Sequence, residues 1–380
     1  MARERVGFAA VTGGYLATTT AEWVLPPLFP LLALELGLGV GGAGAMFAIL
    51  SGSVAVGGLA GGLAIGRLGP RNGVTLALLL VAAGAWLSAA SWGQASLVAG
   101  QAVLGFGSGA FFVPGIRSAA QLAGPRRGLA IGIFGVAYSG GVALAGLLAS
   151  LAEAWGWRST FVAAGALAAG VAAWCVLARL PSRLPAPAGG GGSFRPGAAV
   201  APVVVGGSAA AMQYGAVAFL PLFAVYSWDV SPGTAALVIT ASRVLSVPAK
   251  LLSGNAADRE SSVRIARRLG LGLALLGACW TAAPWPGLAI VAAVVFGAFV
   301  AALGPVANVL ALDAFEGRTH LLGAFRSVQI GFGAATSALI GAGAALFGLQ
   351  AALVVAAVAL PASLIALGRG AHAREESVYS

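Results

Sequence analysis

Runs of about 20 apolar residues recur along the whole chain, and this feature constrains the fold more than any other. A helix of that length crosses a hydrocarbon layer about 30 Å thick. Only 8% of the residues are charged, against about 25% in a soluble domain. We therefore predict an all-α polytopic membrane protein with twelve transmembrane helices, at 7–34, 42–66, 73–91, 95–121, 128–152, 159–180, 200–227, 232–256, 266–283, 286–313, 319–346 and 349–369.

The net charge of +10 has a topological explanation. Arginines gather in every second connection between apolar runs, for example at Arg67 and Arg71 or at Arg264 and Arg267, whereas the connections between them hold few basic residues. This distribution is the positive-inside pattern, and it predicts that both termini are cytoplasmic. Nucleic acid is therefore not an expected partner, whereas membrane lipids are. The bias toward Arg, Ala, Gly and Val indicates a bacterium with a GC-rich genome, so we expect the bacterial cytoplasmic (inner) membrane.

One seam divides the chain into two similar parts. Residues 181–199 are rich in Pro and Gly and are typical of a flexible linker on the cytoplasmic side. Gly156 is matched by Gly348 at an offset of 192, and Pro27 is matched by Pro221 at an offset of 194. We therefore predict that residues 1–180 and 200–380 form two six-helix bundles. Such a duplication is typical of secondary transporters, which bind their substrate between the repeats.

Short motifs strengthen this interpretation. The connection after the second span holds Gly62, Arg67, Gly69 and Arg71, and its second copy holds Asp258 and Arg259. The fourth span contains Gly105, Gly107 and Gly109, and the sixth begins with residues 157–161, Trp-Arg-Ser-Thr-Phe. In these features the whole chain resembles the major facilitator superfamily. The resemblance implies that Arg67, Arg71, Asp258 and Arg259 act in gating, although Gly66 and Gln101 replace an acid and an arginine usual in the family.

Lys250 and Arg326 lie inside two predicted spans, where a charge costs roughly 2.5–3.5 kcal/mol. Each lies eight residues from the charged residue that marks the cytoplasmic end of its span, which corresponds to a depth of roughly 12 Å. In the facilitator fold both of these helices border the central cavity. The two cations could therefore bind a carboxylate, the arginine in bidentate fashion. The alternative is that the side chains reach out to the lipid headgroups.

Two further charged residues lie near mid-membrane. Arg243 precedes Lys250 by two helical turns on the same face, and it could form a second stage for the anion or pair with Glu22. Glu22 is the one carboxylate deep in a span of the first half. Its burial favours the protonated form, so it is a candidate proton-coupling residue. A structural role, with hydrogen bonds to Thr18, Thr19 and Thr20, is the alternative.

Several uncharged polar and aromatic residues fall at depths where they could line the substrate path. For any one of them, hydrogen bonding between helices is the competing interpretation. They are Tyr15, Tyr138, Gln213, Tyr214, Asn308 and Gln329.

Basic residues on the eighth and eleventh spans resemble those of two anion-carrying branches of the superfamily, the monocarboxylate transporters and the oxalate:formate exchangers. We therefore expect a proton-coupled symporter of a small organic anion, monocarboxylate-like, that acts by alternating access and as a monomer. A proton-driven exporter of drugs is the first alternative, and a non-transporting membrane sensor is the second. We expect no enzyme activity, cofactor or metal, because the sequence shows no nucleophile–base set and no metal-ligand cluster. Cys175 and Cys279 are not expected to form a disulfide.

Overall fold

Every regular element of the computed structural model is helical within the residues it describes, which are 2–122, 127–178, 180, 196–257, 259–315 and 319–367. A lipid environment offers no hydrogen bonds to the backbone, so each spanning segment must satisfy its own amides and carbonyls, as a helix does. The first half holds α1 (Ala2–Trp23), α2 (Leu25–Leu36), α3 (Val40–Ala89), α4 (Gln94–Leu122), α5 (Arg127–Ser150), α6 (Ala152–Trp155) and α7 (Trp157–Leu177).

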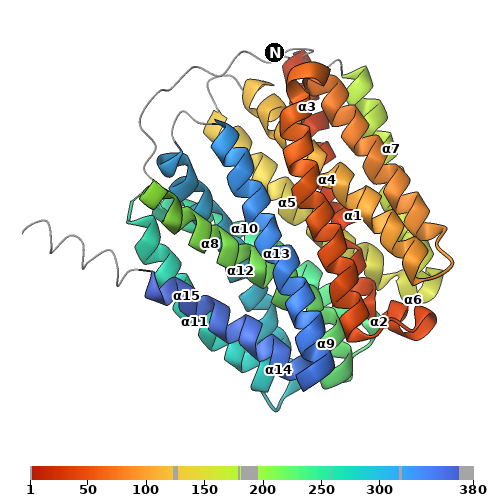
Figure 1. Cartoon of the computed structure of the whole chain (residues 1–380), viewed down its shortest axis with the longest axis vertical. Helices are drawn as coiled ribbons and strands as arrows, with labels where there is room; N and C mark the ends of the chain where they lie inside the picture. The colour runs from red at the N-terminus through yellow and green to blue at the C-terminus, as the bar shows by residue number, and fades with distance from the viewer. Residues whose placement is uncertain are drawn as a thin grey trace, which may run out of the picture.

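The second half follows the same plan. It begins with a 3₁₀ turn, η2 (Pro196–Ala199), and contains α8 (Val200–Met212), the π-helical turn η3 (Gln213–Val217), α9 (Ala218–Trp228), α10 (Pro232–Ala257), α11 (Ser262–Ala282), α12 (Pro286–Ala314), α13 (Thr319–Phe347), α14 (Leu349–Val354), a second π-helical turn η4 (Val355–Ala359) and α15 (Leu360–Ala366). The all-α polytopic fold with two six-helix bundles is confirmed, and Figure 1 shows the bundles side by side.

Ten segments of the described chain are long and apolar enough to cross a membrane. The other two predicted spans are interrupted or polar at one end. The first is divided at Val24 into α1 and α2, because Pro26 and Pro27 occupy the first turn of a new helix, where proline is tolerated. The other is α11, whose first turns carry Arg264, Arg267 and Arg268.

Two predicted spans, 42–66 and 73–91, lie within the single element α3. They are separated by Gly69, which has φ 72° and ψ 166° and is followed by Pro70. Glycine adopts a positive φ without a steric penalty, so the chain reverses here between two helices. The glycines Gly156 and Gly348, which the internal repeat pairs, also share one backbone conformation, with φ values of 76° and 86°.

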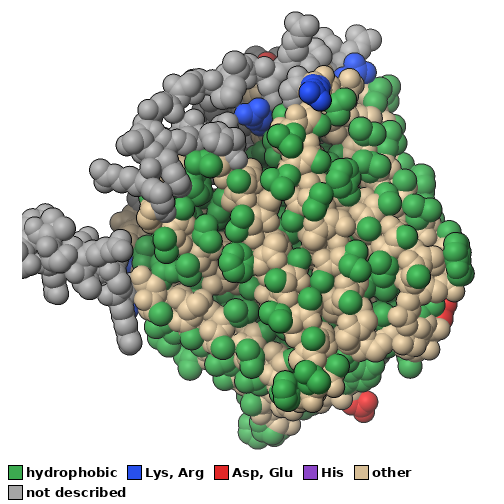
Figure 2. Space-filling model, viewed as in Figure 1, with side chains coloured by type: hydrophobic (Ala, Val, Ile, Leu, Met, Phe, Trp, Pro, Cys, Tyr) green, Lys and Arg blue, Asp and Glu red, His purple; other side chains and the backbone are tan. Residues whose placement is uncertain are grey.

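The two ends of the bundles differ in charge. Lys and Arg side chains lie along the upper edge of the face drawn in Figure 2, whereas acidic side chains lie at its right-hand and lower edges. We call the first the basic end and the second the opposite end. Glu35 in the last turn of α2, Glu153 in α6 and Asp229 between α9 and α10 all lie at the opposite end.

The two halves are in close contact at the opposite end. Gly41 and Gly44 of α3 face Gly341 of α13, and a Cβ added at Gly44 would lie only 2.6 Å from the Cα of Gly341. Small residues allow such backbone contact between helices. On the other flank, a Cβ at Gly146 of α5 would lie 2.8 Å from the carbonyl oxygen of Ala236 of α10. The halves are therefore closed against each other at this end.

Candidate functional site

A small cavity lies between the two halves. Its lining comes from α1, α3, α4 and α5 on one side and from η3 and α13 on the other, so both halves contribute. The free space is about 20 Å³, which is room for about one water molecule. The site is therefore contracted in this conformation. The lining residues are Tyr15, Glu22, Val54, Gly58, Ser108, Gly109, Phe112, Val113, Tyr138, Tyr214, Gly323, Arg326, Ser327 and Ile330.

Glu22 joins the two halves inside this cavity. Its side chain is only 4% exposed. One carboxylate oxygen accepts a hydrogen bond of 2.7 Å from the hydroxyl of Tyr214, and the other accepts one of 2.7 Å from Ser108. Tyr214 belongs to the second half and Ser108 to the first. The hydroxyls of the three threonines before Glu22 donate to backbone carbonyls of their own helix and not to the carboxylate.

The π-helical turn η3 fixes the position of Tyr214. A π turn inserts one extra residue into a helix and often marks a functional site. The hydroxyl of Ser337 in α13 donates to the backbone carbonyl of Tyr214 at 2.7 Å. The tyrosine ring packs against Gly333, where a Cβ would lie 2.8 Å from the ring. These contacts hold the phenol pointed toward Glu22.

Arg326 brings the positive charge to the cavity. It lies on α13 and is partly exposed. One terminal nitrogen donates to Gln329 Oε1 at 2.7 Å, while Nε has no hydrogen-bond partner. The guanidinium stands over the ring of Phe112, 5.0 Å from its centroid, which is the geometry of a cation–π contact. The group is thus held in place and retains donor capacity for a ligand.

Aromatic rings form the wall on the side of the first half. Tyr15 stacks on Phe134 with ring centroids 4.2 Å apart and lies 5.9 Å from Phe112. Tyr138 lies 5.8 Å from Tyr15. Such a wall is apolar over its faces and carries hydroxyl groups at its edge, so it suits a ligand with both an apolar and a polar part.

Lys250 does not line the cavity in this conformation. Its ammonium donates to the hydroxyl of Ser139 at 2.6 Å and lies 5.3 Å from the centroid of the Tyr138 ring. The hydroxyl of Ser246 also donates to Ser139, at 2.9 Å. The lysine therefore connects α10 of the second half to α5 of the first. Its contact with the cavity is indirect, because the ring of Tyr138 that it touches is one of the cavity-lining residues.

Arg243 is completely buried in α10. All three of its guanidinium nitrogens lack a hydrogen-bond partner within the described part of the chain. The proposed pairing with Glu22 is absent there, because the glutamate is bound by Ser108 and Tyr214. The guanidinium faces α12, where a Cβ added at Gly297 would lie 3.4 Å from Nη2.

The remaining predicted residues are dispersed. Gln213 is buried beside Tyr214, whereas Asn308 is exposed and outside the cavity. Of the residues assigned to gating, Arg67 and Arg259 are exposed at the basic end, and Arg71 donates to the carbonyl of Val176 at 3.3 Å, within the first half. Asp258 and most of the linker 181–199 lie outside the described residues.

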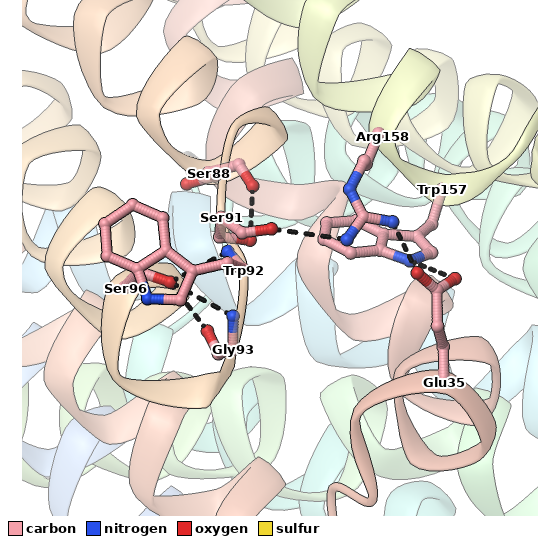
Figure 3. Close-up of polar contacts among 8 residues, drawn as sticks. All are labelled: Glu35, Ser88, Ser91, Trp92, Gly93, Ser96, Trp157 and Arg158. Atoms are coloured by element: carbon pink, nitrogen blue, oxygen red, sulfur yellow. Dashed lines mark hydrogen bonds and ion pairs between the residues drawn. The ribbon is translucent and has the colours of Figure 1, made fainter.

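The motif at the start of α7 organises the opposite end of the first half (Figure 3). Trp157 donates its indole N–H to Glu35 at 2.6 Å, and Arg158 forms an ion pair with the same carboxylate. Arg158 also donates to the carbonyl of Ser91 at 3.2 Å. The Arg158 guanidinium, together with Trp157, holds the pKa of Glu35 below its ordinary value. This network ties α2, α7 and the α3–α4 connection into one unit.

Sequence reasoning did not identify Ser108, Phe112 or Ser139. Ser108 lies within the glycine-rich motif of α4, so a polar side chain among small residues was the available signal. Phe112 follows one helical turn later on the same face. Ser139 is adjacent to a predicted residue, Tyr138, and nothing in the sequence distinguishes it.

No group of three His, Cys, Asp or Glu residues that could hold a metal ion occurs in the part of the chain that the structure describes. Cys175 and Cys279 are both free thiols.

The family model of the Major Facilitator Superfamily matches residues 11–226, more than half of the chain. No curated protein matches this chain by sequence. Among solved structures, the nucleoside transporter NupG is similar, with a TM-score of 0.77 and 14% identity over 95% of this chain and 99% of that one. The xylose transporter XylE from E. coli, in a partially occluded inward-open conformation, has a TM-score of 0.73 and 14% identity over 96% and 99%.

A bacterial homologue of the human lysosomal transporter Spinster, inward-facing and unoccupied, has a TM-score of 0.71 and 16% identity over 96% of this chain and 94% of that one. Identities this low show the shared fold alone. The resemblance to the monocarboxylate and oxalate:formate branch is not among these findings.

Proposed function

Because this chain belongs to the major facilitator superfamily, a family of multi-pass membrane transporters, we propose that it carries a small organic anion across the bacterial cytoplasmic membrane together with protons. Substrate binding takes place in the cavity between the two halves. Rocking of the halves then exposes the site to one side and the other in turn. Both termini are cytoplasmic in this proposal, and the chain acts as a monomer.

The observation that carries the proposal is the position of Arg326. Its guanidinium lines the cavity with an unpartnered Nε and is supported by Gln329 and Phe112. A partly buried cation with an unsatisfied donor is unfavourable, so an entering carboxylate gains a charge-assisted hydrogen bond there. Tyr15 and Tyr138 at the cavity carry further hydroxyl groups, whereas Tyr214 already donates to Glu22.

In this proposal Glu22 couples proton movement to anion transport. It lines the same cavity as Arg326, so an anion that binds the arginine comes near the glutamate. Two negative charges close together in a low dielectric repel, which favours anion binding when Glu22 is protonated. Proton and anion then bind as a pair, which is the requirement for symport. The hydrogen bond from Tyr214 links the protonation state of Glu22 to the second half, because it is donated to this carboxylate.

The proposal is tested with purified protein in proteoliposomes. Uptake of radiolabelled carboxylates, with lactate and succinate as probes, is expected to rise when a proton gradient is directed inward. Arg326→Gln is expected to abolish uptake. Arg264→Gln, which removes the same charge from an exposed position on α11, is the matched control and should retain it. Wild-type uptake that Arg326→Gln leaves unchanged would contradict the anion site.

The role of Glu22 has its own test. Glu22→Gln keeps the size of the side chain but cannot release a proton. We expect this variant to exchange labelled for unlabelled substrate across the membrane while no longer responding to the proton gradient. Accumulation that follows the gradient as in wild type would remove Glu22 as the coupling residue.

Proton-driven export of lipophilic drugs is a second candidate, and one observation favours it. The rings of Tyr15, Phe112 and Tyr138 offer an aromatic surface in the cavity, which the carboxylate of Glu22 also lines. A lipophilic cation such as tetraphenylphosphonium is the probe. Proton-driven movement of this cation, together with no movement of either carboxylate, would replace the first proposal by the second.

A further inference from the structure

The charged groups around Tyr138 are unbalanced. The ammonium of Lys250 lies against its ring, and Arg243, Arg326 and Glu22 are its other charged electrostatic neighbours. The neighbourhood of Tyr138 thus holds three cations and one carboxylate, which leaves an excess of two positive charges. Protonation of Glu22 would raise the excess to three. Buried charges are stable only when they are paired or hydrogen-bonded, so this region is built to receive negative charge.

The hydrogen-bonding capacity is unbalanced in the same way. Arg243 has no hydrogen-bond partner for any of its three nitrogens in the described chain, and Arg326 has none for Nε. Guanidinium carries five N–H donors in a planar fork that matches a carboxylate. Two separate guanidiniums, on α10 and on α13, therefore retain the means to bind an acid group each.

The helix α12 packs closely against Arg243, which is fully buried. The helix that faces it, α12, has a glycine at the point of contact, and a Cβ there would come within 3.4 Å of Nη2 and 2.9 Å of the Ser242 hydroxyl. That hydroxyl already donates to the carbonyl of Ile239, so it can still accept a bond. Gly297 thus allows α12 to approach the guanidinium without placing a side chain against it.

We propose that the transported anion is a short-chain dicarboxylate, with one carboxylate on Arg326 and the other on the α10 cations Arg243 and Lys250, around Tyr138. The assignment rests on the proposed function and refines its substrate class. A single carboxylate would leave the α10 cations unpaired. A phosphate group concentrates its charges at one point, whereas these cations lie on two different helices.

Binding requires the contracted site to widen. The bonds from Lys250 and Ser246 to Ser139 cross from the second half to the first, so they break when α10 moves away from α5. That movement frees the ammonium of Lys250 and opens the approach to Arg243. The second carboxylate then replaces Ser139 as the partner of the lysine.

The test compares two anions of equal chain length. Succinate and butyrate both have four carbons and differ by one carboxylate. Their dissociation constants are measured by isothermal titration calorimetry on the purified full chain. We expect succinate to bind at least about tenfold more tightly, which is 1.4 kcal/mol. In Arg243→Gln this ratio should fall toward one, while Arg264→Gln should preserve it.

Other outcomes separate the two levels of the proposal. If neither succinate nor butyrate binds, the organic-anion function itself fails. If both bind with similar constants, or if Arg243→Gln leaves the ratio intact, the dicarboxylate assignment fails and the organic-anion function stands. Tighter binding of inorganic phosphate than of succinate would also overturn the assignment. Should Arg243→Gln not fold, Lys250→Gln measures the same ratio from the other α10 cation, and the wild-type ratio decides independently.

Discussion

Replacement of Gly44 by alanine should shift the conformational equilibrium of the whole transporter. Gly44 of α3 belongs to the first half and contacts α13 of the second. A Cβ at this position would lie 2.6 Å from the Cα of Gly341 and 2.8 Å from the carbonyl oxygen of Ser337. Both are backbone atoms, so no side-chain rotation can relieve the overlap. The two helices would have to move apart by roughly 1 Å to restore ordinary van der Waals contact.

The alanine at position 44 destabilises only the conformation that is closed at the opposite end. Overpacking of this kind costs about 1–3 kcal/mol, and the contact exists only while the opposite end is closed. At 1.4 kcal/mol for each factor of ten, the population ratio of closed to open states should fall by about five-fold to about a hundred-fold. The gain in helix propensity from glycine to alanine applies to both states, so it does not alter this ratio.

Electron–electron double resonance measures the effect. Spin labels at Trp92 and Trp285, which are 88% and 69% exposed at the opposite end, report the separation of the two halves there. The native Cys175 and Cys279 are first replaced by alanine. We expect Gly44→Ala to increase the population with the longer distance. Gly52→Ala, in the same helix but with nothing within 4 Å of the added Cβ, is the matched control. An unchanged distance distribution in Gly44→Ala would refute the reasoning.

Three further predictions concern single contacts. Tyr214→Phe removes the hydroxyl that binds Glu22 across the halves, and a loss of about 0.5–1.5 kcal/mol should shift the same spin-label distances toward the open state; distances equal to wild type would contradict this. Gly107→Ala places a Cβ 2.8 Å from the Val81 nitrogen, so its melting temperature in detergent should fall below that of Gly52→Ala, and equal melting would refute it. The Arg158 ion pair lowers the pKa of Glu35 from 4.5, so the stabilisation by the pair is present above that pH and is lost as the pH falls through the lowered value. Wild type should therefore lose more thermal stability than Glu35→Gln on acidification, by less than about 1 kcal/mol because the pair is exposed. Equal losses in the two proteins would argue against this role.

The spans and their ends could be read from the sequence. Apolar runs of sufficient length must form helices in lipid, since no other open structure satisfies the backbone there. The first span is an exception, because its break before Pro26 and Pro27 was not predicted, although the chemistry of proline accounts for it. The depth of Lys250 and Arg326 follows from the rise of a helix. These conclusions depend on neighbours in the chain alone, so one sequence was sufficient for them.

The partners of the charged residues depended on the tertiary structure. Glu22 bonds to Ser108 and Tyr214, which are 86 and 192 residues away, and Lys250 bonds to Ser139 at a separation of 111. In a soluble helix, polarity distinguishes the buried face from the exposed one. Here both lipid-facing and core-facing positions are apolar, because lipid and protein interior are equally hydrophobic. The hydrophobic pattern therefore indicates where a residue lies along its span, but not toward which neighbouring helix its side chain points.

The π turn at Gln213–Val217 adds an offset to the helix phase that no periodicity in the sequence marks. What the sequence predicted by itself was the set of spans and the position of each charge along them. Only packing decided that Arg326 reaches the cavity while Lys250 bonds to Ser139, because the rotation of each helix about its axis is set by contacts with its neighbours.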